Sequence, residues 1–447
     1  MEKILKGKNA LIIGLGLSGQ GAMRLAAAAG AMVTGVDCRA SQLPATLFPF
    51  ESTVVETIEA ASLASYDLVV VSPGIPKTNP LYAAALEQRV PVIGEMELAC
   101  RCFSKGRWLA VTGTNGKTTV ALMVEHILKE AGCKTRCLGN VGVAISTSLL
   151  DKPPTDDEIL VIELSSFQLE TLTARRFDAA VVLNITPDHL DRHGSMECYA
   201  ETKIHLLDCM KSGGAFFIHH DYSHLVKKQS FFSYGFDPEC FVYCDRTSVI
   251  VNGIKEFVLP LDYSETISHD VENVMAAYIL CRKIGIVSDA FLKGLNTFRK
   301  PAHRIEYVRS LRGVDFYNDS KATNIDAVVR AVESLKQPIL LIVGGKDKGA
   351  GYTPWISAFT GKVRGVFAIG EAANAIAEAL EGCFPVFLCG SLSEALERSY
   401  ERAQHGDAVM LSPGCSSYDM FDNFEHRGNE FKRLVSNLQE MSHHESA

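Results

Sequence analysis

The chain has 447 residues, of which 47% are hydrophobic and 21% charged, so it can fill several cores and global disorder is excluded. At about 150 residues per domain, this length predicts about three domains. Lys and Arg total 44 against 52 Asp and Glu, a formal net charge of −8, which argues against a general binder of nucleic acid or anionic membranes. No apolar run approaches the ~20 residues of a membrane helix. The 13 cysteines are an odd number without repeated Cys-x-x-Cys pairing, as expected of reduced core thiols in a cytosolic protein.

The first part of the chain alternates short apolar strands with helical stretches. A strand at 9–13 leads into Gly14-Leu15-Gly16-Leu17-Ser18-Gly19, and an alanine-rich helix then runs to Gly30. Further strands are predicted at 33–36, which ends at Asp37, and at 68–71 and 90–93. This alternation favours a parallel sheet covered by helices.

The glycine turn matches Gly-x-Gly-x-x-Gly between a strand and a helix. Such a turn lets backbone N–H groups and the helix dipole meet a pyrophosphate. A dinucleotide such as NAD is one candidate ligand, and a tight turn without a ligand is the alternative. The motif alone does not say which diphosphate binds.

A second glycine-containing loop follows the strand predicted at 108–111. Gly113-Thr114-Asn115-Gly116-Lys117-Thr118-Thr119 precedes a stretch of helical periodicity that closes at Gly132. A loop that presents N–H groups, a lysine and a hydroxyl at a helix start is typical of nucleoside triphosphate binding with Mg²⁺. The loop is two residues shorter between its glycines than the usual phosphate loop, and a non-binding loop is the alternative.

Polar residues stand where the next two strands end, and ligands of open α/β sheets bind at such ends. Glu163 follows the strand predicted at 159–162, and we expect it to coordinate Mg²⁺ beside the phosphates. His189 follows the strand predicted at 180–183, where a solvated loop is the alternative. Taken alone, Lys203 lies in a helical stretch at 195–210 and has the character of an ordinary surface lysine.

The third part of the chain begins near residue 300, with strands predicted at 339–343, 366–369 and 409–411. The stretch 318–324 ends a strand and begins a helix, and the stretch 412–417, which follows a strand, has similar standing. In both stretches, backbone donors and polar side chains converge. A ligand site and a simple capped helix start are therefore both possible interpretations.

Together these motifs resemble the Mur ligase superfamily. The loop at 113–119 is similar to its ATP loop, including the shortened spacing. The stretches 163–170, 184–192, 318–324 and 424–431 resemble the branch that joins D-glutamate to UDP-N-acetylmuramoyl-L-alanine, and the similarity runs from Gly14 to Phe431.

The resemblance implies an α/β protein of three domains. A Rossmann-like domain over 1–98 would bind the UDP substrate, and a P-loop-type ATPase domain with a mostly parallel sheet would span 99–301. A Rossmann-like C-terminal domain over 302–447 would close over ATP and bind the amino acid. The activity implied is ATP-dependent amide formation in peptidoglycan precursor synthesis, through an acyl phosphate and a tetrahedral intermediate. A cytoplasmic monomer is expected, with UDP-N-acetylmuramoyl-L-alanine and D-glutamate as substrates, without nucleic acid and without membrane insertion.

Site roles implied by the resemblance fall into five groups. Catalytic roles fall on Lys117, His189, Lys203 and Lys321. ATP contacts fall on Gly113, Thr114, Asn115, Gly116, Lys117, Thr118, Thr119, Asn273, Arg304, Asp319 and Lys321. Contacts to the UDP substrate fall on Leu17, Ser18, Asp37, Arg39, Gly74, Asn140, Ser165 and Gln168. The D-glutamate pocket falls on Thr323, Lys348, Ser417 and Phe424. Magnesium ligands fall on Thr118, Glu163, His189 and Lys203, with a carbamate formed on Lys203 from CO₂.

Three other functions compete with this interpretation. One is a sister Mur ligase, or a folylpolyglutamate-type ligase, with another acceptor or amino acid. A methylene of difference changes selectivity by only about 1–3 kcal/mol, so spacing cannot choose among these ligases. The second is an NAD-dependent oxidoreductase, against which the second phosphate loop argues. The third is a protein that binds nucleotide without catalysis.

Overall fold

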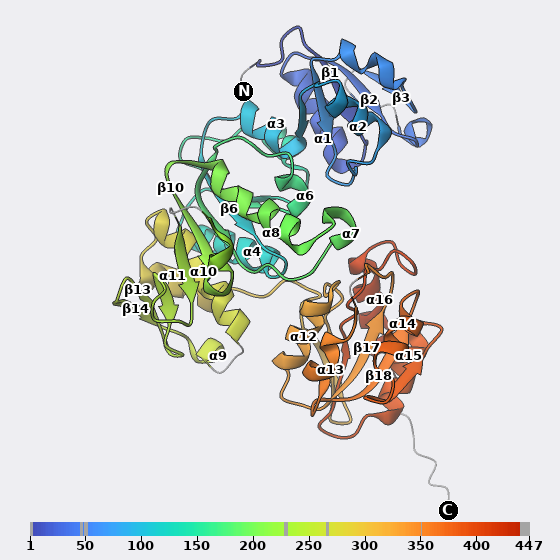
Figure 1. Ribbon diagram of the computed structural model, residues 1–447. Coiled ribbons are helices and arrows are strands. Elements are labelled where there is room, and N and C mark those ends of the chain that lie inside the picture. The colour runs from blue at the N-terminus through green and yellow to red at the C-terminus, as the bar shows by residue number, and fades with distance from the viewer. Residues whose placement is uncertain are drawn as a thin grey trace, which may run out of the picture. The chain divides into compact units, whose positions relative to one another are not determined.

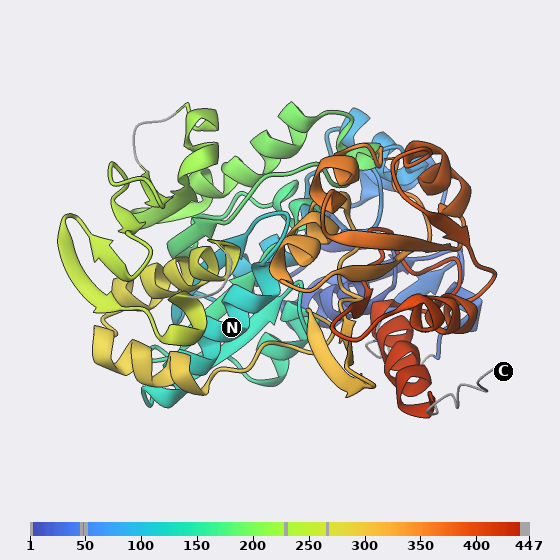
Figure 2. The ribbon, with the colours of Figure 1, turned by 90° about the horizontal axis from the view of Figure 1, so that it is seen from below.

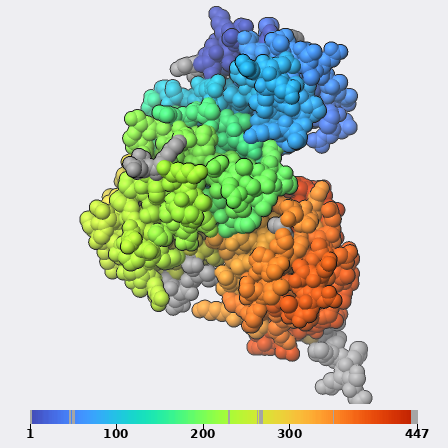
Figure 3. Space-filling view, in the orientation of Figure 1, coloured from blue at the N-terminus to red at the C-terminus, as the bar shows by residue number. Residues whose placement is uncertain are grey.

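The computed structural model describes residues 3–44, 48, 52–227, 231–264, 268–349 and 351–438. The chain divides into two compact units. Unit one comprises Met1–Ile185, Glu197–Ser264 and Val271–Phe298, and unit two comprises Thr186–Met196, Glu265–Asp270 and Arg299–Ala447. Figure 3 shows the surface of the chain, with the long C-terminal stretch of unit two in orange and red. None of the helices in the described ranges combines the length and apolar character needed to cross a bilayer.

The first sheet, in unit one, is entirely parallel, with the order β3-β2-β1-β4-β5 (Figure 1). Its strands are β1 (Asn9–Ile13), β2 (Met32–Val36), β3 (Thr53–Val55), β4 (Leu68–Val71) and β5 (Val92–Gly94). Its helices are α1 (Leu17–Ala28), α2 (Pro80–Glu87) and α3 (Glu95–Cys102). The strand order reverses between β1 and β4, and ligands of such sheets bind at this reversal, beyond the carboxyl ends of the strands.

The second sheet, also in unit one, has the order β14-β13-β12-β11-β10-β9-β6-β8-β7. It is parallel from β7 to β12 and antiparallel from β12 to β14, and β14 can be followed as an edge strand in yellow-green in Figure 2. Its strands are β6 (Arg107–Thr112), β7 (Thr135–Gly139), β8 (Ile159–Glu163), β9 (Phe177–Val182), β10 (Met210–His219), β11 (Phe232–Gly235), β12 (Val242–Cys244), β13 (Ser248–Val251) and β14 (Ile254–Val258). The helices of this part are α4 (Lys117–Glu130), α5 (Ile145–Asp151), α6 (Ser166–Leu169), α8 (Met196–Ile204), α9 (Leu261–Ser264), α10 (Ser268–Lys283) and α11 (Ser288–Thr297).

The third sheet, in unit two, has the order β15-β16-β20-β17-β18-β19. Only the pairing of β15 with β16 is antiparallel, so the loops that follow β16, β20 and β17 leave the same edge of the sheet. The strands are β15 (Glu306–Leu311), β16 (Val314–Asn318), β17 (Ile339–Gly344), β18 (Val363–Ile369), β19 (Val386–Leu388) and β20 (Ala408–Leu411). Unit two also contains α7 (Leu190–His193), α12 (Ile325–Ser334), α13 (Pro354–Phe359), α14 (Ala373–Ala379), α15 (Leu392–Arg402) and α16 (Phe424–Asn437).

Two buried carboxylates of α3 connect the first sheet to the helical layer around the second. Glu95 accepts the N–H of Ser146 in α5 at 2.8 Å, and Glu97 accepts the N–H groups of Thr173 and Ala174 at 2.7 and 2.8 Å. Burial raises the pKa of Glu95. Burial also raises the pKa of Glu97, but its hydrogen bonds outweigh that effect and lower the pKa overall.

One predicted helix is too long. The stretch 195–210 was expected to be helical throughout, but α8 ends at Ile204 and a 3₁₀ turn spans His205–Cys209. Met210 then begins β10 and pairs with Phe177 of β9. Pairing with a strand far away in the sequence therefore overrides the local helical periodicity.

Candidate active site

The loop after β6 lies between the ends of β8 and β9, in the parallel part of the second sheet. Gly113 and Gly116 have φ values of 155° and 85°, a region that favours glycine. A Cβ at Gly116 would come within 2.7 Å of Asn273 Oδ1. Asn184, just beyond β9, accepts the N–H of Asn115 through Oδ1 at 2.7 Å and donates Nδ2 to the Asn115 carbonyl at 3.1 Å. The loop is therefore held in one shape by residues from neighbouring elements.

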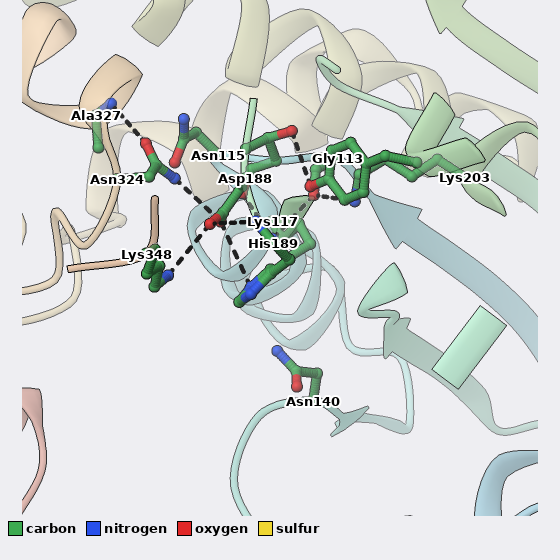
Figure 4. A network of polar contacts seen from close by, with 12 residues as sticks. Gly113, Asn115, Lys117, Asn140, Asp188, His189, Lys203, Asn324, Ala327 and Lys348 are labelled. Atoms are coloured by element: carbon green, nitrogen blue, oxygen red, sulfur yellow. Dashed lines mark hydrogen bonds and ion pairs between the residues drawn. The ribbon is translucent and has the colours of Figure 1, made fainter. Parts of the chain in front are cut away.

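Helix α4 begins at Lys117, and its N-cap, Gly116, has no side chain that could cap it. The first N–H groups of a helix carry partial positive charge, so this end suits a phosphate. Lys117 Nζ donates to the carbonyls of Gly113 and Thr114 at 2.9 and 2.8 Å (Figure 4). The predicted loop, helix and lysine thus occur together as expected, with Thr118 and Thr119 in the first turn.

Lys203 is buried, with 1% of its surface exposed, so the interpretation of it as a surface lysine is wrong. Its Nζ donates to the Gly113 carbonyl at 2.8 Å and lies 4.6 Å from the centre of the Tyr199 ring (Figure 4). Tyr199 in turn shares a hydrogen bond of 3.1 Å with Thr114 Oγ1. A fixed lysine therefore faces the phosphate loop from α8.

Glu163, the last residue of β8, is 1% exposed. Asn140 Nδ2 donates to its Oε1 at 2.9 Å, whereas its Oε2 is buried and has no hydrogen-bond partner among the residues that the structure describes. A buried carboxylate oxygen without a partner is costly unless a cation or a donor occupies the site. Within the described ranges no three His, Cys, Asp or Glu side chains form a ready metal cluster. These observations fit a Mg²⁺ ion whose remaining ligands are phosphate oxygens, hydroxyls and water.

The glycine turn of the first sheet is built for close backbone approach. A Cβ at Gly19 would meet the Gly14 carbonyl at 1.8 Å, and Ser72 Oγ donates to that carbonyl at 2.7 Å. Asp37 accepts the N–H of Leu15, in the glycine turn, at 2.8 Å through Oδ2, and the N–H of Arg39, in the loop after β2, at 2.9 Å through Oδ1. Burial raises the pKa of Asp37, but these bonds outweigh burial and lower the pKa overall. A carboxylate engaged in this way is a poor partner for the ribose of NAD.

Four other residues that we expect to contact the UDP substrate also belong to unit one. Leu17 is 74% exposed at the start of α1, and a Cβ at Gly74 would meet nothing within 4 Å. Ser165 and Gln168 form a capping box: Ser165 Oγ accepts the N–H of Gln168 at 3.2 Å, and Gln168 Oε1 accepts the N–H of Ser165 at 3.0 Å. These two side chains therefore have a structural role, and their contact with the substrate stays a prediction.

In unit two, a group of polar side chains converges on Asp188 (Figure 4). Lys348 Nζ donates to its Oδ1 at 3.2 Å, Asn324 Nδ2 donates to its Oδ2 at 3.3 Å, and His189 Nε2 lies 3.5 Å from Oδ2. His189 is the N-cap of α7 and has a φ of 53°, a left-handed value that is uncommon outside glycine. The structure thus brings together the predicted Lys348 and His189 around Asp188, to which sequence reasoning assigned no role.

Asp319, just beyond β16, is 6% exposed. Ser412 Oγ donates to its Oδ2 at 2.9 Å, and the Ile305 N–H donates to its Oδ1 at 3.2 Å. Burial raises the pKa of Asp319 to about 7, against the lowering effect of these bonds and of Arg304. Ile305 has a φ of 48°, which is rare for a β-branched residue, so the backbone beside Arg304 is strained.

Lys321 Nζ lies 3.6 Å from the centre of the Phe424 ring, a cation–π contact between two predicted site residues. Ser417 is buried on the loop after β20, and Thr323 is half-buried before α12. These four residues all stand at the edge of the third sheet from which the loops after β16 and β20 leave.

Comparison with known proteins decides the family. Residues 8–94 match the N-terminal domain of MurD-like Mur ligases, 111–281 the Mur ligase middle domain, and 303–415 the Mur ligase glutamate ligase domain. The chain belongs to the Mur ligase family. It is 46% identical to the UDP-N-acetylmuramoylalanine–D-glutamate ligase of Protochlamydia amoebophila (strain UWE25), over 97% of this chain and 98% of that protein. It is 38% identical to the enzyme of the same name from Myxococcus xanthus (strain DK1622), over 98% and 100%.

Solved structures confirm the fold of this Mur ligase. The UDP-N-acetylmuramate–alanine ligase of Thermotoga maritima superposes with a TM-score of 0.60 at 18% identity, covering 96% of this chain and all of that one. A pseudomurein peptide ligase type C from Methanothermus fervidus gives a TM-score of 0.60 at 16% identity, covering 97% and 100%. The predicted α/β class, with three domains and mostly parallel sheets, is confirmed.

Proposed function

We propose that this Mur ligase joins D-glutamate to UDP-N-acetylmuramoyl-L-alanine, with cleavage of ATP to ADP and phosphate. The observation that carries the proposal is the combination of a phosphate loop with a buried lysine and a buried, half-satisfied carboxylate around it. Relatives that bear the name of this reaction align with nearly the whole chain. The nucleotide substrates support a cytoplasmic enzyme.

The chemical problem is that a free carboxylate is a poor electrophile. Transfer of the γ-phosphoryl group to the alanyl carboxylate supplies a leaving group, and the amine of D-glutamate then attacks the acyl phosphate. Loss of phosphate from the tetrahedral intermediate gives the amide. The protein's task in both steps is to position the groups and to neutralise charge on the phosphoryl oxygens.

On this proposal, each group around the phosphate loop has a distinct role. The loop N–H groups and Lys117 hold the ATP phosphates, and Lys117 moves from the carbonyls of Gly113 and Thr114 to the phosphate oxygens. Asn273, which lies against Gly116, contacts adenine. In unit two, Arg304, Asp319 and Lys321 contribute to ATP binding. The turn at 14–19 with Asp37, Arg39 and Gly74 binds the UDP moiety, while Asn140, Ser165 and Gln168 contact the muramoyl-alanine part.

The metal ligands proposed are Thr118, Glu163, His189 and Lys203. Bound Mg²⁺ supplies positive charge beside the phosphates. An unmodified ammonium at Lys203 would repel the metal, whereas a carbamate formed from CO₂ would present two oxygens to it. In buffer with ¹³C-labelled bicarbonate, we expect a carbamate carbon resonance that Lys203→Ala abolishes. A spectrum without that resonance would contradict the modification.

D-Glutamate binding is assigned to the edge of the third sheet. Lys348 Nζ, which pairs with Asp188 Oδ1 at 3.2 Å, supplies a positive charge for a carboxylate of D-glutamate. Thr323, Ser417 and Phe424 complete the proposed pocket. The proposed domain boundaries place these residues in a C-terminal domain over 302–447, after a UDP-binding domain over 1–98 and an ATP-binding domain over 99–301.

The proposal is tested by phosphate release from ATP with UDP-N-acetylmuramoyl-L-alanine and, in parallel, D-glutamate, L-glutamate, L-alanine or a diamino acid. Release with D-glutamate alone, together with a product of the summed mass less water, is expected. Release with a different amino acid would identify a sister ligase. Absence of release with every amine would contradict the proposed reaction.

A further inference from the structure

Arg427 lies inside the stretch 424–431, yet nothing above gives it a role. It belongs to α16 and is 1% exposed. Its Nε donates to Ser320 Oγ at 3.0 Å, and its Nη2 donates to the Ser320 carbonyl at 2.9 Å. Nη1 and Nη2 both donate to the Cys415 carbonyl at 3.2 Å, and Nη1 also reaches the Ser416 carbonyl at 3.4 Å.

These acceptors belong to two different loops, and a third loop touches the same guanidinium. Ser320 follows β16, whereas Cys415 and Ser416 follow β20. A Cβ at Gly345, just beyond β17, would come within 3.2 Å of Arg427 Nη1. Lys346 and Ser416 exchange backbone hydrogen bonds of 2.9 and 3.1 Å, so the loops after β17 and β20 are also joined directly. One side chain therefore lies against three of the loops that leave this edge of the sheet, those after β16, β20 and β17.

Placing a guanidinium here is costly, because burial removes it from water. Among the described residues, every hydrogen-bond acceptor of Arg427 is a backbone carbonyl or the Ser320 hydroxyl, and none is a carboxylate. Burial lowers the pKa of Arg427 to about 10, so it stays charged at neutral pH. A planar fork with five donors suits several carbonyls at fixed angles, whereas the single ammonium of lysine does not.

We propose that Arg427 is a positioning residue for amino-acid binding, which sets the spacing of the three loops that carry Lys321, Ser417 and Lys348. The inference rests on the proposed function, because these loops carry the D-glutamate pocket. Phe424 is positioned by the same network, since Ser320 Oγ donates to the Phe424 carbonyl at 2.9 Å while accepting from Arg427. Arg427 itself contacts no substrate and acts through the loops.

Unit one contains a matched control. Arg176 is 7% exposed, and its Nη2 donates to the carbonyls of Ser104 and Lys105 at 2.6 and 2.7 Å. Its guanidinium also lies 4.6 Å from the centre of the Trp108 ring. Arg176 is thus another buried guanidinium bound to backbone carbonyls, but its contacts in the described ranges include none of the proposed site residues. Replacement of either arginine by lysine removes the same kind of interaction.

The experiment compares Arg427→Lys with Arg176→Lys in the full chain. Arg427→Lys is expected to raise KM for D-glutamate about tenfold or more, while KM for UDP-N-acetylmuramoyl-L-alanine stays within about twofold of the wild type. Arg176→Lys is expected to leave both KM values within about twofold while lowering the melting temperature. An equal rise in KM for D-glutamate in both variants, or no rise in Arg427→Lys, would overturn the proposal.

Two further measurements probe the hydrogen-bond network of Arg427. Ser320→Ala removes one acceptor and is expected to raise KM for D-glutamate by a smaller factor, so an unchanged value would contradict the network. Hydrogen exchange does not depend on activity: Arg427→Lys should speed exchange in 318–324, 345–348 and 412–417, and Arg176→Lys should not. Unchanged exchange in these loops would also overturn the proposal. Wild-type protein without ligase turnover would reject the proposed function, while the exchange data would still decide the role of Arg427 as a positioning residue.

Discussion

At the scale of single residues, burial decides what a charged side chain can do in this protein. Within the described part of the chain, Asn140 satisfies one oxygen of Glu163, and the other oxygen is buried without a hydrogen-bond partner. Without a bound cation, such an oxygen lowers the stability of the protein, because it is buried without a partner. When a cation binds, the oxygen can serve as its ligand. Stability and activity should therefore respond in opposite directions to its removal.

We expect Glu163→Gln to keep or raise the free energy of unfolding, by up to about 1 kcal/mol, because a neutral amide is cheaper to bury. Ligase activity should fall roughly 100-fold, with a higher Mg²⁺ requirement. Denaturant titration and initial rates at varied Mg²⁺ measure the two effects.

Glu158→Gln is the control, since Glu158 is buried but paired with Arg136 at 2.7 Å. It should lower stability and leave the Mg²⁺ requirement unchanged. A destabilised Glu163→Gln with normal activity would contradict the metal role.

Asp319 gives a prediction about pH. Its folded-state pKa of about 7 exceeds its ordinary value of 3.8, so between these values the folded state binds more protons than the unfolded state. Stability from this group is present at low pH and is lost as pH rises through 7. Asp319→Asn cannot titrate and should therefore gain about 2–3 kcal/mol relative to wild type between pH 5 and 7.5.

The measurement is urea unfolding followed by the fluorescence of Trp355, which is buried in the core beside the third sheet. A Trp108→Phe background leaves Trp355 as the only tryptophan, because the chain has 2. A stability difference between Asp319→Asn and wild type that does not change with pH would contradict the raised pKa.

At the scale of elements, the phosphate loop requires glycine at position 116 for two separable reasons: its positive φ and the lack of space for a Cβ. Gly116 has a φ of 85° and faces Asn273 Oδ1, whereas Gly132, after the end of α4, has a φ of 79° and faces open space. Gly132→Ala should cost about 1 kcal/mol from backbone strain alone and leave KM for ATP unchanged. Gly116→Ala should cost more and raise KM for ATP about tenfold or more. Thermal unfolding and ATP kinetics of the two variants test this, and equal ATP kinetics would contradict the role of the loop.

Local sequence patterns predicted the elements that carry the site better than the contacts between them. The strand predicted at 68–71 and the loop at 113–119 occur as expected, because periodicity and glycine spacing are local signals. The burial of Lys203 depends on Gly113, which lies 90 positions away, and the pairing of Lys348 with Asp188 spans 160. Contacts between residues so far apart leave no periodic trace in one sequence. The role proposed for Lys203 comes from the resemblance to the Mur ligases, because its local pattern indicated only a surface lysine.

At the scale of the whole molecule, the proposed boundary near residue 302 can be tested by expression of fragments. Both hydrophobic clusters around the third sheet are built from residues between Ile305 and Leu438. A fragment over 302–447 should therefore fold and unfold cooperatively, with Trp355 as the reporter. A fragment over 313–447 lacks β15 and exposes the edge of β16, so it should be markedly less stable. Failure of the longer fragment to fold would contradict the proposed boundary.

The central claim is that ATP activates the alanyl carboxylate as an acyl phosphate. The most direct test uses UDP-N-acetylmuramoyl-L-alanine labelled with ¹⁸O in that carboxylate, with ATP, Mg²⁺ and D-glutamate. Mass spectrometry of the released phosphate should show one ¹⁸O atom per turnover, because the carboxylate oxygen leaves with the phosphoryl group. Phosphate without the label would show that ATP is cleaved without phosphorylating the substrate, and would contradict the account.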